Sequence, residues 1–101
     1  MADTAPRPTL CFNASFPLEV HFAATAGELA SRLAQSAGLA EDEAREIGRS
    51  VDEAFTSVLN SRGPNGASAI DISLCARHDN FDASVAFGST SVLAITRPRP
   101  L

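Results

Sequence analysis

The sequence predicts an α+β fold, a two-layer sandwich in which two helices pack on one face of a four- or five-stranded, mostly antiparallel (mixed) sheet. Apolar residues recur at spacings of three and four in the middle of the chain, as in amphipathic helices. In the last third they alternate with polar residues at a period of two, as in half-buried strands. A chain of 101 residues can bury one core, so we expect a single domain over 1–101, with a flexible N-terminus at 1–7 and a Pro-rich tail at 97–101.

Two extended segments are expected near the start of the chain. Residues 9–12 are the first, and residues 18–22 are the second because they alternate apolar and polar side chains. Pro17 marks a break or an edge position between them. This pattern places His21 on the outer face of the second strand.

The two predicted helices follow. Residues 25–28 (Thr-Ala-Gly-Glu) match a capping box, so the first helix is expected to begin there, to run to about Ala37 and to end at Gly38. The second helix begins near Ala40, where acidic residues 41–43 stabilise the positive end of its dipole. Its apolar residues keep helical spacing over about five turns: Ala44, Ile47, Val51, Ala54, Phe55, Val58 and Leu59.

The remaining elements are a loop and a hairpin. Residues 61–68 are rich in glycine, proline and asparagine, which indicates a loop. Residues 70–76 and 81–87 alternate at a period of two around Arg-His-Asp-Asn, which predicts a hairpin with His78 at its tip. Gly88 and Ser89 allow another turn, and residues 92–96 form the last expected strand.

Composition limits the kind of partner. Twelve acids face eight bases, for a net charge of −4, and the bases form no cluster except near the last residues, which argues against a nucleic-acid surface. The sequence has neither an apolar run of about 18 residues nor the pattern of a signal peptide, so we expect a cytoplasmic protein that does not bind a membrane. Cys11 and Cys75 are interpreted as buried thiols in a reducing cytosol.

The second predicted helix carries a row of polar residues opposite its apolar stripe. Ser50, Glu53, Ser57 and Asn60 fall on this side at 100° per residue. One interpretation is a solvated helix face. The other is a site that holds a water molecule or a ligand, with Glu53 as general base.

The chain also resembles a known family. The segment "TAGELASRLAQSAGLAEDEAREIGRSVDEAFTSVLN" is similar to the first two helices of the anti-sigma-factor serine kinases, a branch of the ATPase fold shared by histidine kinases, gyrase B, Hsp90 and MutL. "GPNG" followed by "IDISL" resembles the linker into the central strands of that family, and "GSTSVLAITRP" resembles its closing strand. The resemblance covers about residues 18–98 and implies a minimal histidine-kinase-like ATPase fold.

The resemblance implies roles for two residues and the loss of several others. Glu53 stands at the general base of the family, and Ser57 at the asparagine that holds magnesium. The Asp-x-Gly-x-Gly box that recognises adenine would fall near residues 87–91, where this chain reads "FGSTS" without an acid. Almost no residues are left for the ATP lid. Glu53 and Ser57 are therefore expected to be the remnant of a nucleotide and magnesium site, with no catalytic residue, no cofactor and no resident metal.

These expectations lead to a non-catalytic regulatory module that binds a sigma factor, an anti-anti-sigma protein or a signalling kinase, with Ser50, Glu53, Ser57 and Asn60 as its contact surface. Edge pairing of residues 18–22 would also give a homodimer. The alternative is an active serine kinase that uses Glu53, ATP and magnesium. In a third interpretation, the likeness reflects only a common order of helices and hairpins.

Overall fold

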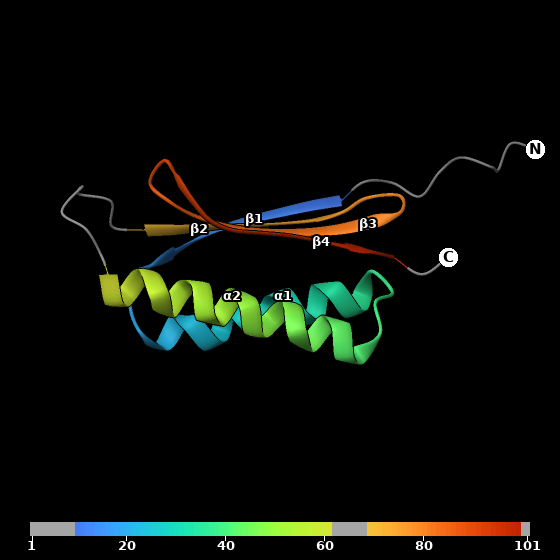
Figure 1. The fold of residues 1–101 in the computed structure, drawn as a ribbon, viewed down its shortest axis with the longest axis horizontal. Coiled ribbons are helices and arrows are strands. Elements are labelled where there is room, and N and C mark those ends of the chain that lie inside the picture. The colour runs from blue at the N-terminus through green and yellow to red at the C-terminus, as the bar shows by residue number, and fades with distance from the viewer. Residues whose placement is uncertain (1–9, 62–68, 100–101) are drawn as a thin grey trace, which may run out of the picture.

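The fold is a two-layer α+β sandwich, as predicted. The computed structural model describes residues 10–61 and 69–99. Its elements are β1 (Leu10–Pro17), α1 (His21–Ser36), α2 (Glu41–Ser61), β2 (Ala69–Ala76), β3 (Asn80–Phe87) and β4 (Thr90–Pro98). Both helices cover the same face of a four-stranded sheet (Figure 1). The expectations for residues 1–7 and for the "GPNG" linker lie outside the described residues.

The sheet follows chain order, β1-β2-β3-β4, and each pair of neighbours is antiparallel. None of the described strands makes the parallel pair that a mixed sheet would contain. The predicted hairpin of residues 70–76 and 81–87 is confirmed as β2 and β3, and His78 lies in the turn between them. Both helices come between β1 and β2 in the chain. In the sheet, however, β1 lies at the edge, directly beside β2.

Residues 18–22 do not form a strand, and this prediction was wrong. β1 ends at Pro17, and α1 begins at His21. The amide of Phe22 donates to the carbonyl of Glu19 at 3.0 Å, which closes the first turn. Leu18 and Phe22 are four positions apart, so a window of five residues fits the helical period as well as the period of strands. An edge-paired dimer through residues 18–22 is therefore ruled out.

The predicted capping box was also wrong, because the helix starts before it. Thr25 lies within α1, and its hydroxyl donates to the carbonyl of His21 at 3.5 Å, one turn back in the same helix. His21 lies on the first turn of α1 and not on a strand; its Nε2 is 3.3 Å from Oε1 of Glu19. The other end of the helix is as predicted, since Gly38 has a φ of 100° just beyond it.

The two helices contact each other through backbone. A Cβ added at Gly27 would lie 2.6 Å from the carbonyl oxygen of Gly48, and a Cβ at Gly48 would lie 2.6 Å from that of Gly27. Four alanines on α1 extend the small-residue surface into the core: Ala23, Ala26, Ala30 and Ala34. Neither helix is long and apolar enough to cross a membrane.

Gly27→Ala and Gly48→Ala are each expected to lower the free energy of unfolding by about 1–3 kcal/mol, because the new methyl group must push two backbones apart. The sign of the change is diagnostic, because helix propensity alone would make each alanine variant more stable by about 1 kcal/mol. Urea denaturation followed by circular dichroism measures the change. Ala24→Gly, at an exposed position of α1, is the control for helix propensity. A gain in stability from either glycine variant would contradict the close approach.

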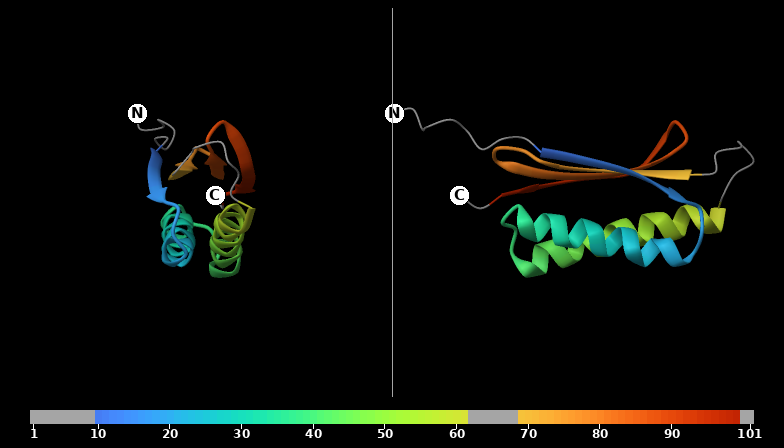
Figure 2. Two further views of the ribbon diagram at one scale, coloured as in Figure 1. Left: turned by 90° about the vertical axis from the view of Figure 1, so that its left-hand side faces the viewer. Right: turned by 180° about the vertical axis from the view of Figure 1, so that it is seen from behind.

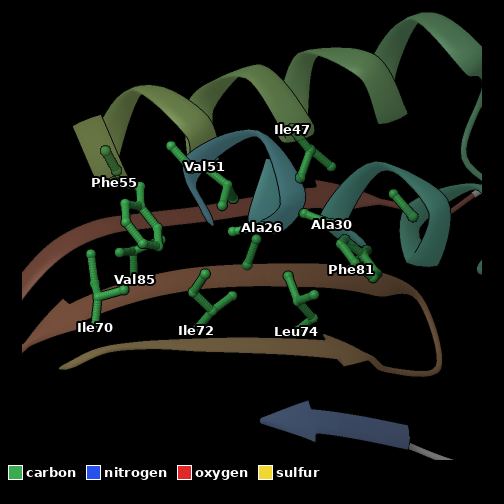
Figure 3. Packing of buried hydrophobic residues seen from close by; sticks show 14 of the residues in the cluster. Ala26, Ala30, Ile47, Val51, Phe55, Ile70, Ile72, Leu74, Phe81 and Val85 are labelled. Atoms are coloured by element: carbon green, nitrogen blue, oxygen red, sulfur yellow. The ribbon is translucent and has the colours of Figure 1, made fainter. Parts of the chain in front are cut away.

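The core lies between the helices and one face of the sheet. Ile47, Val51 and Phe55 of α2 point from the helix toward Ile72 and Val85 of the sheet (Figure 3). The predicted apolar stripe of α2 is buried, except that Leu59 is half-buried. Buried residues of β2 and β3 that point toward the helices complete this core: Ile70, Leu74, Phe81, Ala83 and Phe87. The opposite face of the sheet carries the alternate residues and is not covered by a helix (Figure 1).

A tight turn joins β3 to β4. Gly88 has a φ of 64°, a left-handed conformation that glycine adopts without steric cost, and Ser89 completes the turn. β4 extends beyond the predicted residues 92–96 at both ends and includes Arg97 and Pro98, which we had assigned to the tail. The pairing register of β3 with β4 shifts between Val85 and Ala86.

Candidate functional site

The predicted polar row lies on the outer side of α2. Glu53, Ser57 and Asn60 are exposed, and Ser50 is half-buried. They lie away from Val51 and the other buried residues of the helix. The structure therefore brings the four side chains together along one flank of α2. We call these four residues the α2 row.

The α2 row lies on the side of the helix that is nearer to β4. α2 runs beneath β4, whereas α1 runs beneath β1 (left view of Figure 2). Glu46, four residues before Ser50, reaches Nη2 of Arg97 on β4 with its Oε1 at 3.9 Å. The exposed side chain of Glu53 can be reached by a partner from outside without any movement of the sheet.

Three hollows formed by the described residues lie away from the α2 row. One of them, of about 240 Å³, has mostly apolar walls and lies between β1, the end of α1, β2 and β3. A shallow groove of about 330 Å³ runs between the helices above Gly27 and Gly48. A third hollow, of about 300 Å³, lies between β1 and β2. Glu53 and Ser57 line none of the three.

The apolar hollow, which we call the β1–α1 pocket, was not predicted. Leu10 and Phe12 of β1 face Leu33 of α1 across it, and Phe81 of β3 lies at its base. Arg99 forms part of its wall, with Nε donating to the carbonyl of Ala37 at 2.8 Å. Sequence periodicity cannot find this pocket, because its walls come from four elements that meet only in the folded chain.

The two cysteines correct another expectation. Cys11 and Cys75 form a disulfide between β1 and β2, and are not separate buried thiols. They are direct partners in the register of the two strands. Cys75 is only 8% exposed, whereas Cys11 is exposed at the edge of the sheet. The sequence did not indicate this bond. The two cysteines are 64 residues apart and become neighbours only when β1 pairs with β2 in the sheet.

The disulfide belongs to a row across the uncovered face of the sheet. Cys75 lies opposite Asp82, and Asp82 lies opposite Thr96. Oδ2 of Asp82 accepts from Nε of Arg77 at 2.6 Å, and Oδ1 accepts from the hydroxyl of Thr96 at 2.8 Å. Burial raises the pKa of Asp82, but hydrogen bonds from Arg77 and Thr96 and the charge of Arg77 outweigh it, so the net pKa is lowered.

Asp82→Asn is expected to lower the free energy of unfolding at pH 7. The difference in stability between this variant and the wild type should be smaller at acidic pH. A lowered pKa means that the ionised carboxylate stabilises the fold above its unfolded pKa of about 3.9, and that this contribution is lost as pH falls through the folded pKa. Urea midpoints of both proteins at pH 7, 4 and 3 should therefore converge on acidification. Asp79→Asn in the same hairpin is the control. A difference that stays constant across this range would contradict the assignment.

Comparison with known proteins adds no relative: no family model matches the chain, and no curated protein matches it. The resemblance to the anti-sigma-factor kinases therefore stays a prediction.

Proposed function

We propose that the chain is a non-catalytic regulatory module, derived from a histidine-kinase-like ATPase domain of the anti-sigma-factor branch, that acts by binding another protein. Its partner would be a sigma factor, an anti-anti-sigma protein or a signalling kinase in bacterial signalling or transcription control. The cytoplasm is the proposed location. The observation that best supports this function is the tight turn at Gly88 and Ser89.

This turn occupies the place where the resemblance puts adenine recognition and the ATP lid. Phe87 pairs directly with Thr90, and Ala86 pairs with Ser91, so the segment is used to join two strands. Its side chains offer no carboxylate for an adenine amino group. Each lost interaction of about 1.4 kcal/mol weakens binding tenfold, so losing both aspartate recognition and the lid should cost several factors of ten.

The position of Glu53 supports the same proposal. Its carboxylate is exposed on the outer flank of α2, where water screens its interactions, and it lies outside the three hollows. An exposed row of carboxylate, hydroxyl and amide groups suits the polar rim of a protein interface. The α2 row would then serve as a contact surface, with its ancestral role in nucleotide binding lost.

Titration calorimetry with ATP and magnesium at millimolar concentrations tests the absence of nucleotide binding. We expect no saturable heat from the wild-type protein. Saturable heat that disappears in Glu53→Ala or Ser57→Ala would overturn the proposal and favour the active serine kinase. Heat that survives both variants would also contradict it, and would place a nucleotide elsewhere on the chain.

Binding to candidate partners tests the contact surface. Glu53→Arg and Asn60→Arg are each expected to weaken binding to a sigma factor, anti-anti-sigma protein or kinase of the source organism by at least about tenfold, because they place a bulky cation in the interface. Gln35→Arg, at an exposed position of α1, is the matched control and should bind as the wild type does. Equal losses in all three variants would contradict a surface on α2.

A further inference from the structure

The β1–α1 pocket lies where small side chains leave space between the sheet and α1. Toward the end of β1, Phe16 packs against Phe22 of α1 and Phe55 of α2, with ring centroids 6.1 Å and 6.2 Å apart. These rings fill the layer between strand and helices. At the start of β1, Ala76 of β2 and Ala37 of α1 contribute only methyl groups, and a hollow of about 240 Å³ remains.

The walls of the pocket on the sheet side are apolar. Leu10 lies directly opposite Ala76 in the register of β1 with β2, and Phe12 lies opposite Leu74. Leu74 and Phe81 are only 2% and 1% exposed and point toward the helices (Figure 3). Leu10 and Phe12, in contrast, are 70% and 37% exposed, so apolar surface at the mouth of the pocket is in contact with water. A ligand with an apolar body would remove this surface from water, which favours binding.

Arg99 places a positive charge at the wall of this pocket. Its backbone amide donates to the carbonyl of Asp79 at 2.9 Å. Its Nε donates to the carbonyl of Ala37 at 2.8 Å, and its Nη1 donates to the carbonyl of Arg77. The guanidinium is therefore held between the end of α1 and the turn that joins β2 to β3. Because its position is fixed by the fold, little side-chain entropy is lost when a ligand binds to it.

No carboxylate among the described residues pairs with Arg99. Other arginines form ion pairs with acidic side chains: Arg32, Arg45, Arg77 and Arg97. The partners of the Arg99 side chain are neutral backbone carbonyls. A guanidinium has five N–H donors, so these two bonds leave three for a ligand. A half-buried cation of this kind attracts an anion, and the planar guanidinium fork matches a carboxylate. One guanidinium neutralises the single charge of a carboxylate, whereas a phosphate carries up to two charges.

We propose that the β1–α1 pocket binds a small carboxylic acid with an apolar tail, of the class of medium-chain fatty acids. The carboxylate pairs with the guanidinium of Arg99, and the tail lies between Phe12 of β1 and Leu33 of α1. Sites for drug-sized ligands have volumes of about 300–1,000 Å³. A pocket of about 240 Å³ therefore suits a smaller ligand. The pocket lies away from the α2 row, so this inference does not rest on the proposed protein-binding function.

Titration calorimetry of the full chain with octanoate tests the proposal, and we expect saturable binding. 1-Octanol has a chain of the same length without the charge, and it should bind at least about tenfold more weakly because it cannot pair with a guanidinium as an anion does. Hexanoate should bind roughly tenfold more weakly than octanoate, since two fewer methylene groups leave water. Octanoate at about five times its Kd should raise the thermal midpoint of unfolding by about 4–8 °C.

Two variants locate the site. Leu10→Glu changes an exposed residue at the mouth of the pocket, and its carboxylate should repel octanoate and weaken binding at least about tenfold. Val20→Glu is the matched control, because Val20 is 74% exposed and lies at the opposite end of α1 from the pocket. Arg99→Gln should weaken octanoate binding at least about tenfold and change the affinity for 1-octanol little. Circular dichroism checks that each variant is folded.

Three results would overturn this site. The first is a wild-type protein that gives neither saturable heat nor a thermal shift with octanoate at millimolar concentrations. The second is 1-octanol binding as tightly as octanoate, which would remove the role of the charge. The third is an equal loss of affinity in Leu10→Glu and Val20→Glu, which would place the ligand elsewhere. Should Arg99→Gln fail to fold, the comparison of Leu10→Glu with Val20→Glu still decides the location.

Discussion

Reduction of the Cys11–Cys75 disulfide is expected to lower the free energy of unfolding by about 4 kcal/mol. The bond closes a loop of 64 residues, and in the chain-entropy model a loop of this length restricts the unfolded state by about that amount. A small domain is typically stable by only about 5–15 kcal/mol, so the reduced protein would lose a large share of its stability. Because Cys11 is on the edge strand, β1 is the first element that we expect to separate from the sheet.

Urea denaturation with and without a phosphine reductant measures this loss, which should appear as a lower midpoint with little change in slope. The double variant Cys11→Ser with Cys75→Ser should be as unstable as the reduced protein and should not respond to reductant. Two alkylatable thiols in the purified, unreduced protein would contradict the disulfide. Rapid alkylation of cells before lysis also tests the proposed cytoplasmic location, where thiols are kept reduced.

The long periodic elements could be predicted from the sequence. α2 shows its apolar spacing over 21 residues, so the helical period is unambiguous, and the β2–β3 hairpin alternates over two strands of eight residues each. Residues 18–22 were misassigned because five residues cannot separate a helical turn from a strand. Helix α1 is rich in alanine, which carries little directional signal, so its start depended on a capping motif that happens to occur inside the helix.

The candidate site, too, could be predicted from the sequence only in part. The common flank of Glu53, Ser57 and Asn60 follows from the helical angle alone. The helical angle alone does not predict that this flank lies toward β4. The sequence leaves open on which side of α2 the helix α1 packs. The disulfide and the β1–α1 pocket were missed for a related reason: each joins residues of β1 to residues of β2 or β3 far along the chain, and only the sheet order brings them together.

Phe55→Ala is expected to lower the free energy of unfolding by about 3–5 kcal/mol, the usual cost of truncating a buried phenylalanine. Phe55 has no exposed surface, and its ring meets that of Phe16 edge to face, with centroids 6.2 Å apart. The side chain thus joins α2 to the edge strand β1 as well as to the central core. Against a total stability of about 5–15 kcal/mol, this loss should leave a substantial unfolded population at 37 °C.

Thermal and urea unfolding of Phe55→Ala, Phe16→Ala and the double variant separate the two contributions. The aromatic contact should appear as a coupling energy of about 0.5–1.5 kcal/mol between the single variants. Leu59→Ala, at a half-buried position one turn later, is the control and should cost less than Phe55→Ala. If Phe55→Ala cost less than Leu59→Ala, α2 would not present this face to the sheet. The assignment of Glu53, Ser57 and Asn60 to its outer flank would then fail with it, because one helical rotation fixes both faces.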